Sequence, residues 1–177
     1  NLSVAAPGFF TLAKSRMGMP ILYGLCEKEI CWFSVGDDGQ LAVCGSRPNS
    51  SGGAAHLCVD PKTRFLFTAN YGSGNVSMLP IDDDGSLGKV TTYEHGPGAH
   101  NGAVGAWGDG PQFRQESAHP HGVAVFDGTL YVADLGTNGI VSWSIDYEAG
   151  ILRPAGSVTV HDVCLLYTSP SPRDSTL

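Results

Sequence analysis

Residues 65–87 read FLFTANYGSGNVSMLPIDDDGSL, in which a short apolar strand, a glycine-containing turn, a second apolar strand and an acidic turn follow one another. The same order recurs in ILYGLCEKEICWFSVGDDGQL at residues 21–41 and in TLYVADLGTNGIVSWSIDYEAGI at residues 129–151. An offset of 46 residues aligns the first copy with the second and pairs Leu41 with Leu87, whereas the third copy follows the second at an offset of 64. The chain therefore contains an internal repeat, with an insertion of 18 residues before the third copy.

A four-stranded unit that recurs every roughly 40 to 50 residues, with glycine turns, is typical of a β-propeller. No window longer than one turn shows the i, i+3, i+4 apolar stripe of a helix. We therefore predict an all-β chain made of four-stranded antiparallel blades. Strands are expected at residues 56–59, 65–69, 76–81 and 90–93 of the second unit, and at residues 123–126, 130–133, 140–145 and 152–158 of the third.

The composition excludes several classes of protein and partner. Glycine supplies 24 of the 177 residues and charged side chains only 15%, which argues against a coiled coil or a helix bundle. The net charge of -7 lacks the basic surface that nucleic acids and anionic membranes require. No apolar run reaches the roughly 18 residues of a membrane-spanning helix, so we expect neither a nucleic-acid nor a membrane partner.

The five cysteines, at positions 26, 31, 44, 58 and 164, form no CxxC pair and no Cys/His array with the spacing of a zinc site. An odd number of scattered cysteines suits a reducing compartment, where a buried thiol serves as a small apolar group. We therefore expect free thiols, no metal, no cofactor and a cytoplasmic location.

Several stretches, taken together and in order, resemble one known family. They are HLCVDP from His56, ANYGSGNV from Ala69, DGSLG from Asp84, RQESAHPH from Arg114 and ADLGT from Ala133. These motifs resemble the lactonase family of seven-bladed β-propellers, which includes propeller-type 6-phosphogluconolactonases and fungal 3-carboxy-cis,cis-muconate lactonizing enzymes. The resemblance covers about residues 5–158 and implies a closed ring of seven blades.

The length accommodates about three units, so the chain is expected to be a partial propeller over residues 1–163. Terminal blades then present unpaired edges, and the chain alone is expected to be aggregation-prone and inactive. The Pro/Ser-containing end, residues 164–177, breaks the repeat and resembles read-through into adaptor sequence. We expect it to be a non-native or disordered tail.

One end of the propeller is expected to collect the residues that carry chemistry. Strand direction alternates within a blade, so the start of each innermost strand and the turn between the second and third strands lie on the same face. This arrangement places there His56 and His121 at strand starts, Asn70, Tyr71 and Asp134 in turns, and Arg114, Gln115, Glu116 and His119 in the insertion.

The resemblance implies roles for these residues, and each role has a structural alternative. His121 is the candidate catalytic base or acid, or else a hydrogen-bond partner of a neighbouring blade's backbone. His119 is expected to orient it, and Glu116 to orient His121 or act as the base, unless Glu116 is a solvated loop carboxylate. Arg114 would grip an anionic substrate or organise the loop through a salt bridge. Substrate binding is expected from Gln115, His56, Asn70, Tyr71 and Asp134, although Asn70 and Tyr71 also suit a turn.

The resemblance implies a carboxylic-ester hydrolase, a 6-phosphogluconolactonase that hydrolyses 6-phosphoglucono-δ-lactone in the pentose phosphate pathway, with a small sugar lactone as its partner. A muconate-type cycloisomerase is one alternative, and a non-catalytic propeller that binds a protein on the same face is another. In the lactonizing-enzyme branch the proposed histidine acts with residues of later blades, so three blades hold at most part of a site.

Overall fold

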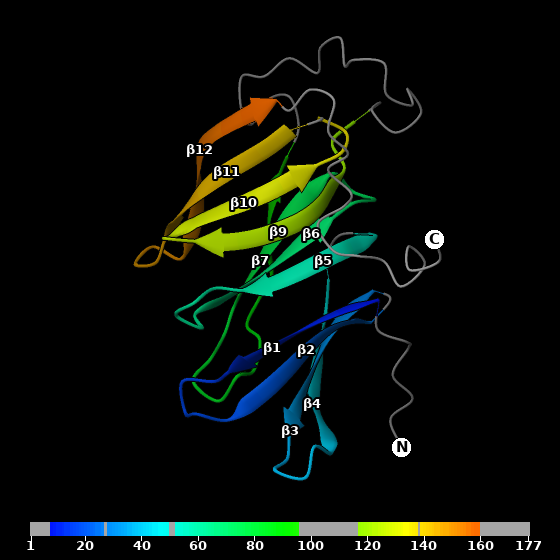
Figure 1. Cartoon of the computed structure of the whole chain (residues 1–177), viewed down its shortest axis with the longest axis vertical. Coiled ribbons are helices and arrows are strands. Elements are labelled where there is room, and N and C mark those ends of the chain that lie inside the picture. Colours follow the sequence, from blue (N-terminus) through cyan, green and yellow to red (C-terminus); the bar gives the residue numbers. More distant parts are fainter. Residues whose placement is uncertain (1–7, 27, 50–51, 96–116, 138, 160–177) are drawn as a thin grey trace, which may run out of the picture.

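The computed structural model describes residues 8–26, 28–49, 52–95, 117–137 and 139–159. Within these ranges the chain forms strands and turns and no helix. The strands make three four-stranded antiparallel sheets (Figure 1), which we call blades 1, 2 and 3. Blade 1 holds β1 (Phe9–Lys14), β2 (Pro20–Cys26), β3 (Glu29–Val35) and β4 (Leu41–Pro48). Blade 2 holds β5 (Ala54–Val59), β6 (Phe65–Asn70), β7 (Asn75–Pro80) and β8 (Thr91–Glu94), and blade 3 holds β9 (Pro120–Phe126), β10 (Thr129–Asp134), β11 (Gly139–Asp146) and β12 (Ile151–Thr159).

The propeller prediction is confirmed, and the expected strands of blades 2 and 3 lie within three residues of the observed ones. One difference concerns the end of the third strand of blade 2, which was expected to include Ile81. In the structure β7 stops at Pro80, and Ile81 forms an isolated bridge with Leu87. The Ile81 N–H donates to the Arg64 carbonyl instead, so this residue already belongs to the turn.

The turns between strands follow from residues that tolerate a left-handed backbone. Gly85, in the acidic turn after β7, has a φ of 92°, a conformation that side chains with a Cβ rarely adopt. Its carbonyl accepts a hydrogen bond of 2.8 Å from the buried hydroxyl of Tyr23 in blade 1. This turn therefore also joins two blades.

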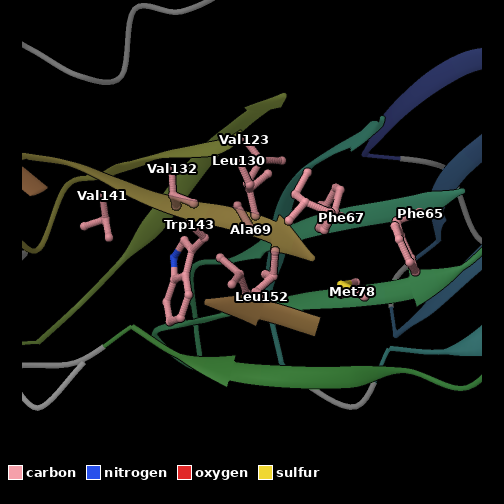
Figure 2. Packing of buried hydrophobic residues seen from close by; sticks show 12 residues of the cluster. Phe65, Phe67, Ala69, Met78, Val123, Leu130, Val132, Val141, Trp143 and Leu152 are labelled. Carbon is pink, nitrogen blue, oxygen red and sulfur yellow. The ribbon is translucent and has the colours of Figure 1, made fainter. Parts of the chain in front are cut away.

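The blades pack face to face through two apolar layers. Figure 2 shows the layer between blades 2 and 3, which includes Phe67 and Met78 of blade 2 and Leu130 and Trp143 of blade 3. The layer between blades 1 and 2 includes Tyr23, whose side chain is fully buried. Because alternate residues of a strand point to opposite faces, blade 2 is buried on both faces, as the unbroken burial of β6 shows.

The outer faces of blades 1 and 3 carry exposed apolar side chains. Phe10 and Leu12 of β1 are each 62% exposed, and Phe126 at the end of β9 is 73% exposed. Their neighbours in the same strands point into the packed layers. Each outer face therefore has the pattern of a blade that lacks a neighbour within the described residues.

The first strand of each blade lies beside the first strand of the next, because β5 contacts both β1 and β9. The starts of these strands meet the turns that follow β6 and β10 at one end of the molecule. Backbone hydrogen bonds mark this end: Gly72 N–H donates to Gly53 O, and Leu135 N–H donates to His119 O. The expected shared face of strand starts and turns is therefore present. Among the described residues, no helix could cross a membrane.

Candidate functional site

An imidazole and phenol cluster lies where blades 2 and 3 meet, at the end of the molecule just described. His56 is the third residue of β5, and His121 is the second residue of β9. Tyr71 begins the turn after β6, and His119 immediately precedes β9. Four residues from three separate parts of the sequence are thus brought close to one another at the inner edge of two adjacent blades.

His119 is held from two sides. Its main-chain N–H donates to the Asp134 carboxylate at 2.7 Å, and its carbonyl accepts from Leu135 N–H at 3.1 Å. Its ring Nδ1 lies 2.9 Å from the carbonyl oxygen of Tyr71. Since a carbonyl only accepts, Nδ1 carries the hydrogen in this arrangement. The Ser117 hydroxyl lies 3.4 Å from the other ring nitrogen, Nε2.

The ring of Tyr71 contacts both histidines of blade 3. It stacks on His119 with ring centroids 4.6 Å apart and planes inclined by 21°. It meets His121 edge to face, with centroids 5.9 Å apart and planes at 89°. Both geometries are favourable for aromatic rings. His121 is half-buried here, and this burial lowers its pKa below the ordinary histidine value.

His56 bridges blades 2 and 3. Its Nδ1 accepts a hydrogen bond of 3.5 Å from the main-chain N–H of Val123, and its ring lies 4.0 Å from that of Phe9. Burial lowers the pKa of His56, and the charge of nearby His121 lowers it further. The contact with a neighbouring blade's backbone, which we considered for His121, is thus made by His56.

Asn70, a predicted substrate-binding residue, is the last residue of β6 and is fully buried. Its carboxamide oxygen accepts from Asn49 at 2.9 Å and from Thr68 at 3.0 Å, and its NH₂ donates to Asn75 at 2.9 Å and to Ser77 at 2.8 Å. These bonds use all four hydrogen-bonding positions of the amide. Asn70 therefore stabilises the turn that carries Tyr71. Contact between Asn70 and substrate stays a prediction, and the full burial of the side chain argues against it.

Asp134 is equally buried, at the end of β10. Its Oδ1 accepts from the main-chain N–H groups of His119 at 2.7 Å and Thr137 at 3.1 Å. Its Oδ2 lies 3.4 Å from Nε2 of His95, which is also fully buried. Burial raises the pKa of Asp134 even though these backbone donors act to lower it. Asp134 thus contacts both the end of blade 2 and the start of β9. Substrate binding by Asp134 stays a prediction.

Three of the predicted residues, Arg114, Gln115 and Glu116, lie outside the described residues. Two structurally important residues, Asn49 and His95, were absent from the predicted site. Asn49 is a polar residue at the junction between two repeats, and His95 follows a repeat's last strand. Their partners lie 21 and 39 positions away in the sequence, so no local pattern indicated them.

A hollow of about 260 Å³ lies beside His56, and its other walls are Gly122, Val123, Ala124, Tyr131, Ala133 and Ile140. His119 and His121 do not line it. The side chains of Ala124, Tyr131 and Ala133 alternate with those that face blade 2, so this hollow opens on the outer face of blade 3.

The cluster supplies three half-buried imidazoles, those of His56, His119 and His121, and the phenol of Tyr71. Burial lowers the pKa values of His56 and His121, which favours the neutral form of both rings. The Nδ1 atom of His56 already accepts from Val123 N–H, so His121 is the better candidate of the two to accept a proton. This property suits a general base. The described residues contain no group of three or more His, Cys, Asp or Glu side chains placed to hold a metal ion. The four described cysteines are free thiols, of which Cys26 and Cys31 are buried.

The fold and the cluster define a β-propeller with imidazoles gathered at the inner edge of adjacent blades. Residues 3–163 match the family described as "Lactonase, 7-bladed beta-propeller". The chain therefore belongs to this lactonase family, as its motifs predicted.

Relatives and solved structures agree with this family. The chain is 30% identical over 123 residues to the 6-phosphogluconolactonase of Bacillus subtilis, a match that covers 68% of the chain and 32% of that protein. It superposes with a TM-score of 0.72 and 22% identity on a Bacteroides fragilis protein provisionally described as a 6-phosphogluconolactonase, covering 90% of this chain and 46% of the other. The periplasmic gluconolactonase of Pseudomonas aeruginosa gives a TM-score of 0.62 at 18% identity, with 85% and 39% covered. These structures show the shared fold, and the chain spans less than half the length of each relative.

Proposed function

We propose that this chain is part of a seven-bladed lactone hydrolase that acts on 6-phosphoglucono-δ-lactone. The observation that carries the proposal is the position of His121, neutral and half-buried beside Tyr71 and His56, in a chain of the lactonase family. The name of the Bacillus subtilis relative supports the choice of substrate, which would place the reaction in the pentose phosphate pathway.

In the proposed reaction, His121 takes a proton from a water molecule as the water oxygen attacks the lactone carbonyl. The tetrahedral intermediate then collapses, and the ring C–O bond breaks. The imidazolium returns the proton to the leaving alkoxide, which becomes the hydroxyl of the open acid. Arg114, in the segment before β9, is the group of this chain proposed to bind the substrate's phosphate.

The exposed apolar faces of blades 1 and 3 support the proposal that further blades complete the ring. Phe10 and Leu12 lie on one open face, and Phe126 and Tyr131 lie on the other. The chain spans 32% and 46% of the lengths of two relatives, so these proteins have room for such blades. We further propose a reducing, cytoplasmic location, which the buried free thiols Cys26 and Cys31 support.

The experiment that tests this function is a substrate comparison with the whole protein. Hydrolysis of 6-phosphoglucono-δ-lactone is expected to exceed that of unphosphorylated glucono-δ-lactone in kcat/KM, because only the former offers a phosphate to a cationic side chain. Cycloisomerisation of 3-carboxy-cis,cis-muconate without lactone hydrolysis would favour the lactonizing-enzyme alternative. Absence of both activities would refute the proposal and leave a binding platform.

A further inference from the structure

We propose that Tyr71 is a positioning residue, which reaches from blade 2 to hold the segment from His119 to His121 of blade 3 in its working orientation. The expected effect of Tyr71 on catalysis rests on the proposed lactone hydrolysis. The contacts of the Tyr71 ring with the two histidines can be tested without any measurement of activity.

Tyr71 contacts His119 through both its backbone and its ring. The carbonyl oxygen of Tyr71 accepts from His119 Nδ1 at 2.9 Å, and the two rings stack with centroids 4.6 Å apart. A hydrogen bond at the ring edge and a stack on the ring face restrict both side-chain torsions of His119. Blade 2 thus fixes the side chain of a residue that belongs to blade 3.

Blade 3 fixes the main chain of the same residue. The N–H of His119 donates to Asp134, and its carbonyl accepts from Leu135. Only Pro120 separates His119 from His121, and a proline restricts both its own φ and the backbone of the residue before it. The hydrogen bond and the stack from Tyr71 therefore act on a residue whose backbone is already restricted and which lies two positions before His121.

Tyr71 also touches His121 directly. The edge-to-face contact, with centroids 5.9 Å apart and planes at 89°, places the phenol ring as a wall beside the imidazole. This wall excludes water from one side of His121, and burial of this kind lowers the pKa of the imidazole. Removing the ring should therefore both loosen His121 and solvate it.

The turn that carries Tyr71 is itself held rigidly against blade 3. Asn70, the preceding residue, is anchored by four side-chain hydrogen bonds, and its carbonyl accepts from Gly74 N–H at 2.9 Å. Gly74 has a φ of 70°, and a Cβ there would lie 2.8 Å from the Ala118 carbonyl oxygen. The turn and the residues just before β9 are thus in close contact, and this contact fixes the backbone position of Tyr71.

The test compares Tyr71→Ala with Tyr71→Phe in the whole protein. Tyr147→Ala is the matched control, because Tyr147 of blade 3 also reaches blade 2, where its hydroxyl donates to Asp60 at the opposite end of the blades. The histidine rings are titrated by NMR, and the signal of His121 is assigned by its loss in His121→Gln. The same variants are then assayed for kcat and KM with the lactone.

Tyr71→Ala is expected to raise the pKa of His121 by about half a unit or more, whereas Tyr71→Phe and Tyr147→Ala leave this pKa at the wild-type value. Tyr71→Ala is also expected to lower kcat about tenfold or more with KM changed less than about twofold, and Tyr71→Phe to recover most of that loss. An unchanged His121 pKa in Tyr71→Ala would overturn the proposal. So would equal effects of the Ala and Phe substitutions, or a rise in KM alone, since a phenol that binds substrate gives those results. If the wild-type protein hydrolyses no lactone, the proposed function fails, and the titration still decides whether Tyr71 positions His121.

Discussion

Replacing Asn70 by alanine separates a structural role from a substrate-binding role at this position. The side chain is fully buried and makes four hydrogen bonds, to Asn49, Thr68, Asn75 and Ser77. Alanine removes all four bonds and leaves a small space where water would have to enter a buried polar cluster. We therefore expect Asn70→Ala to act on folding stability.

The expected loss follows from the number of bonds. A buried neutral hydrogen bond contributes about 1 kcal/mol net, and partners left unsatisfied add to the cost of removing it. Two partners keep another bond, because Asn75 Oδ1 also accepts from Ser73 and the Ser77 hydroxyl also donates to Asn49. Asn70→Ala should therefore lower the free energy of unfolding by about 4 kcal/mol.

The assay is urea unfolding of the whole protein, followed by tryptophan fluorescence, with Glu148→Ala as an exposed control that should change little. A double-mutant cycle with Asn49→Ala should reveal coupling between the two amides, because they share a direct bond. A structural role for Asn70 would be contradicted if Asn70→Ala lost less than about 1 kcal/mol of stability while KM rose severalfold. That result would instead assign Asn70 to the substrate channel.

Two further predictions concern the segment before β9 and the titration of the cluster. In Gly136→Ala the new Cβ would overlap the Ser117 carbonyl oxygen and lie 2.8 Å from the main-chain nitrogen of His119. We therefore expect about 1 to 3 kcal/mol of destabilisation, measured by thermal unfolding, together with a reduced kcat. A wild-type midpoint would contradict this expectation. The pKa values of His56 and His121 are lowered on folding, so the stability they confer is complete above the unfolded pKa of about 6.5 and is lost as pH falls from there through their folded values. Urea midpoints measured at descending pH should show this loss of stability. The acid limb of the kcat/KM profile should lie below about pH 6.5. An acid limb above that pH would exclude His121 as the base.

Most of the fold could be predicted from the repeat. Short apolar runs at residues 65–69 and 130–133, bounded by turn residues, specified strands that the structure confirms. A repeat constrains topology strongly because each copy must pack on the next. The strand boundary at Pro80 and Ile81 could not be predicted, because it depends on a backbone bond to Arg64 rather than on hydropathy.

The candidate site was predicted as a location but not as a set of contacts. Strand direction alone placed His56, Tyr71 and His121 at one end. The structure brings the rings of Tyr71 and His121 into edge-to-face contact and places His56 near His121. A polar residue at a strand end, however, looks the same in sequence whether it faces solvent or a buried partner. Asn70 and Asp134 are buried because of partners in adjoining segments, and such long-range pairings leave no local signal.

We propose His121 as the proton acceptor of a lactone hydrolase. The most direct test measures kcat for 6-phosphoglucono-δ-lactone in the whole protein and in His121→Gln, with the unfolding midpoint of both recorded as a control for folding. A general base contributes about 10²- to 10⁴-fold, so we predict a loss of at least about a hundredfold in kcat at an unchanged midpoint. A fully active, stably folded His121→Gln protein would contradict the claim.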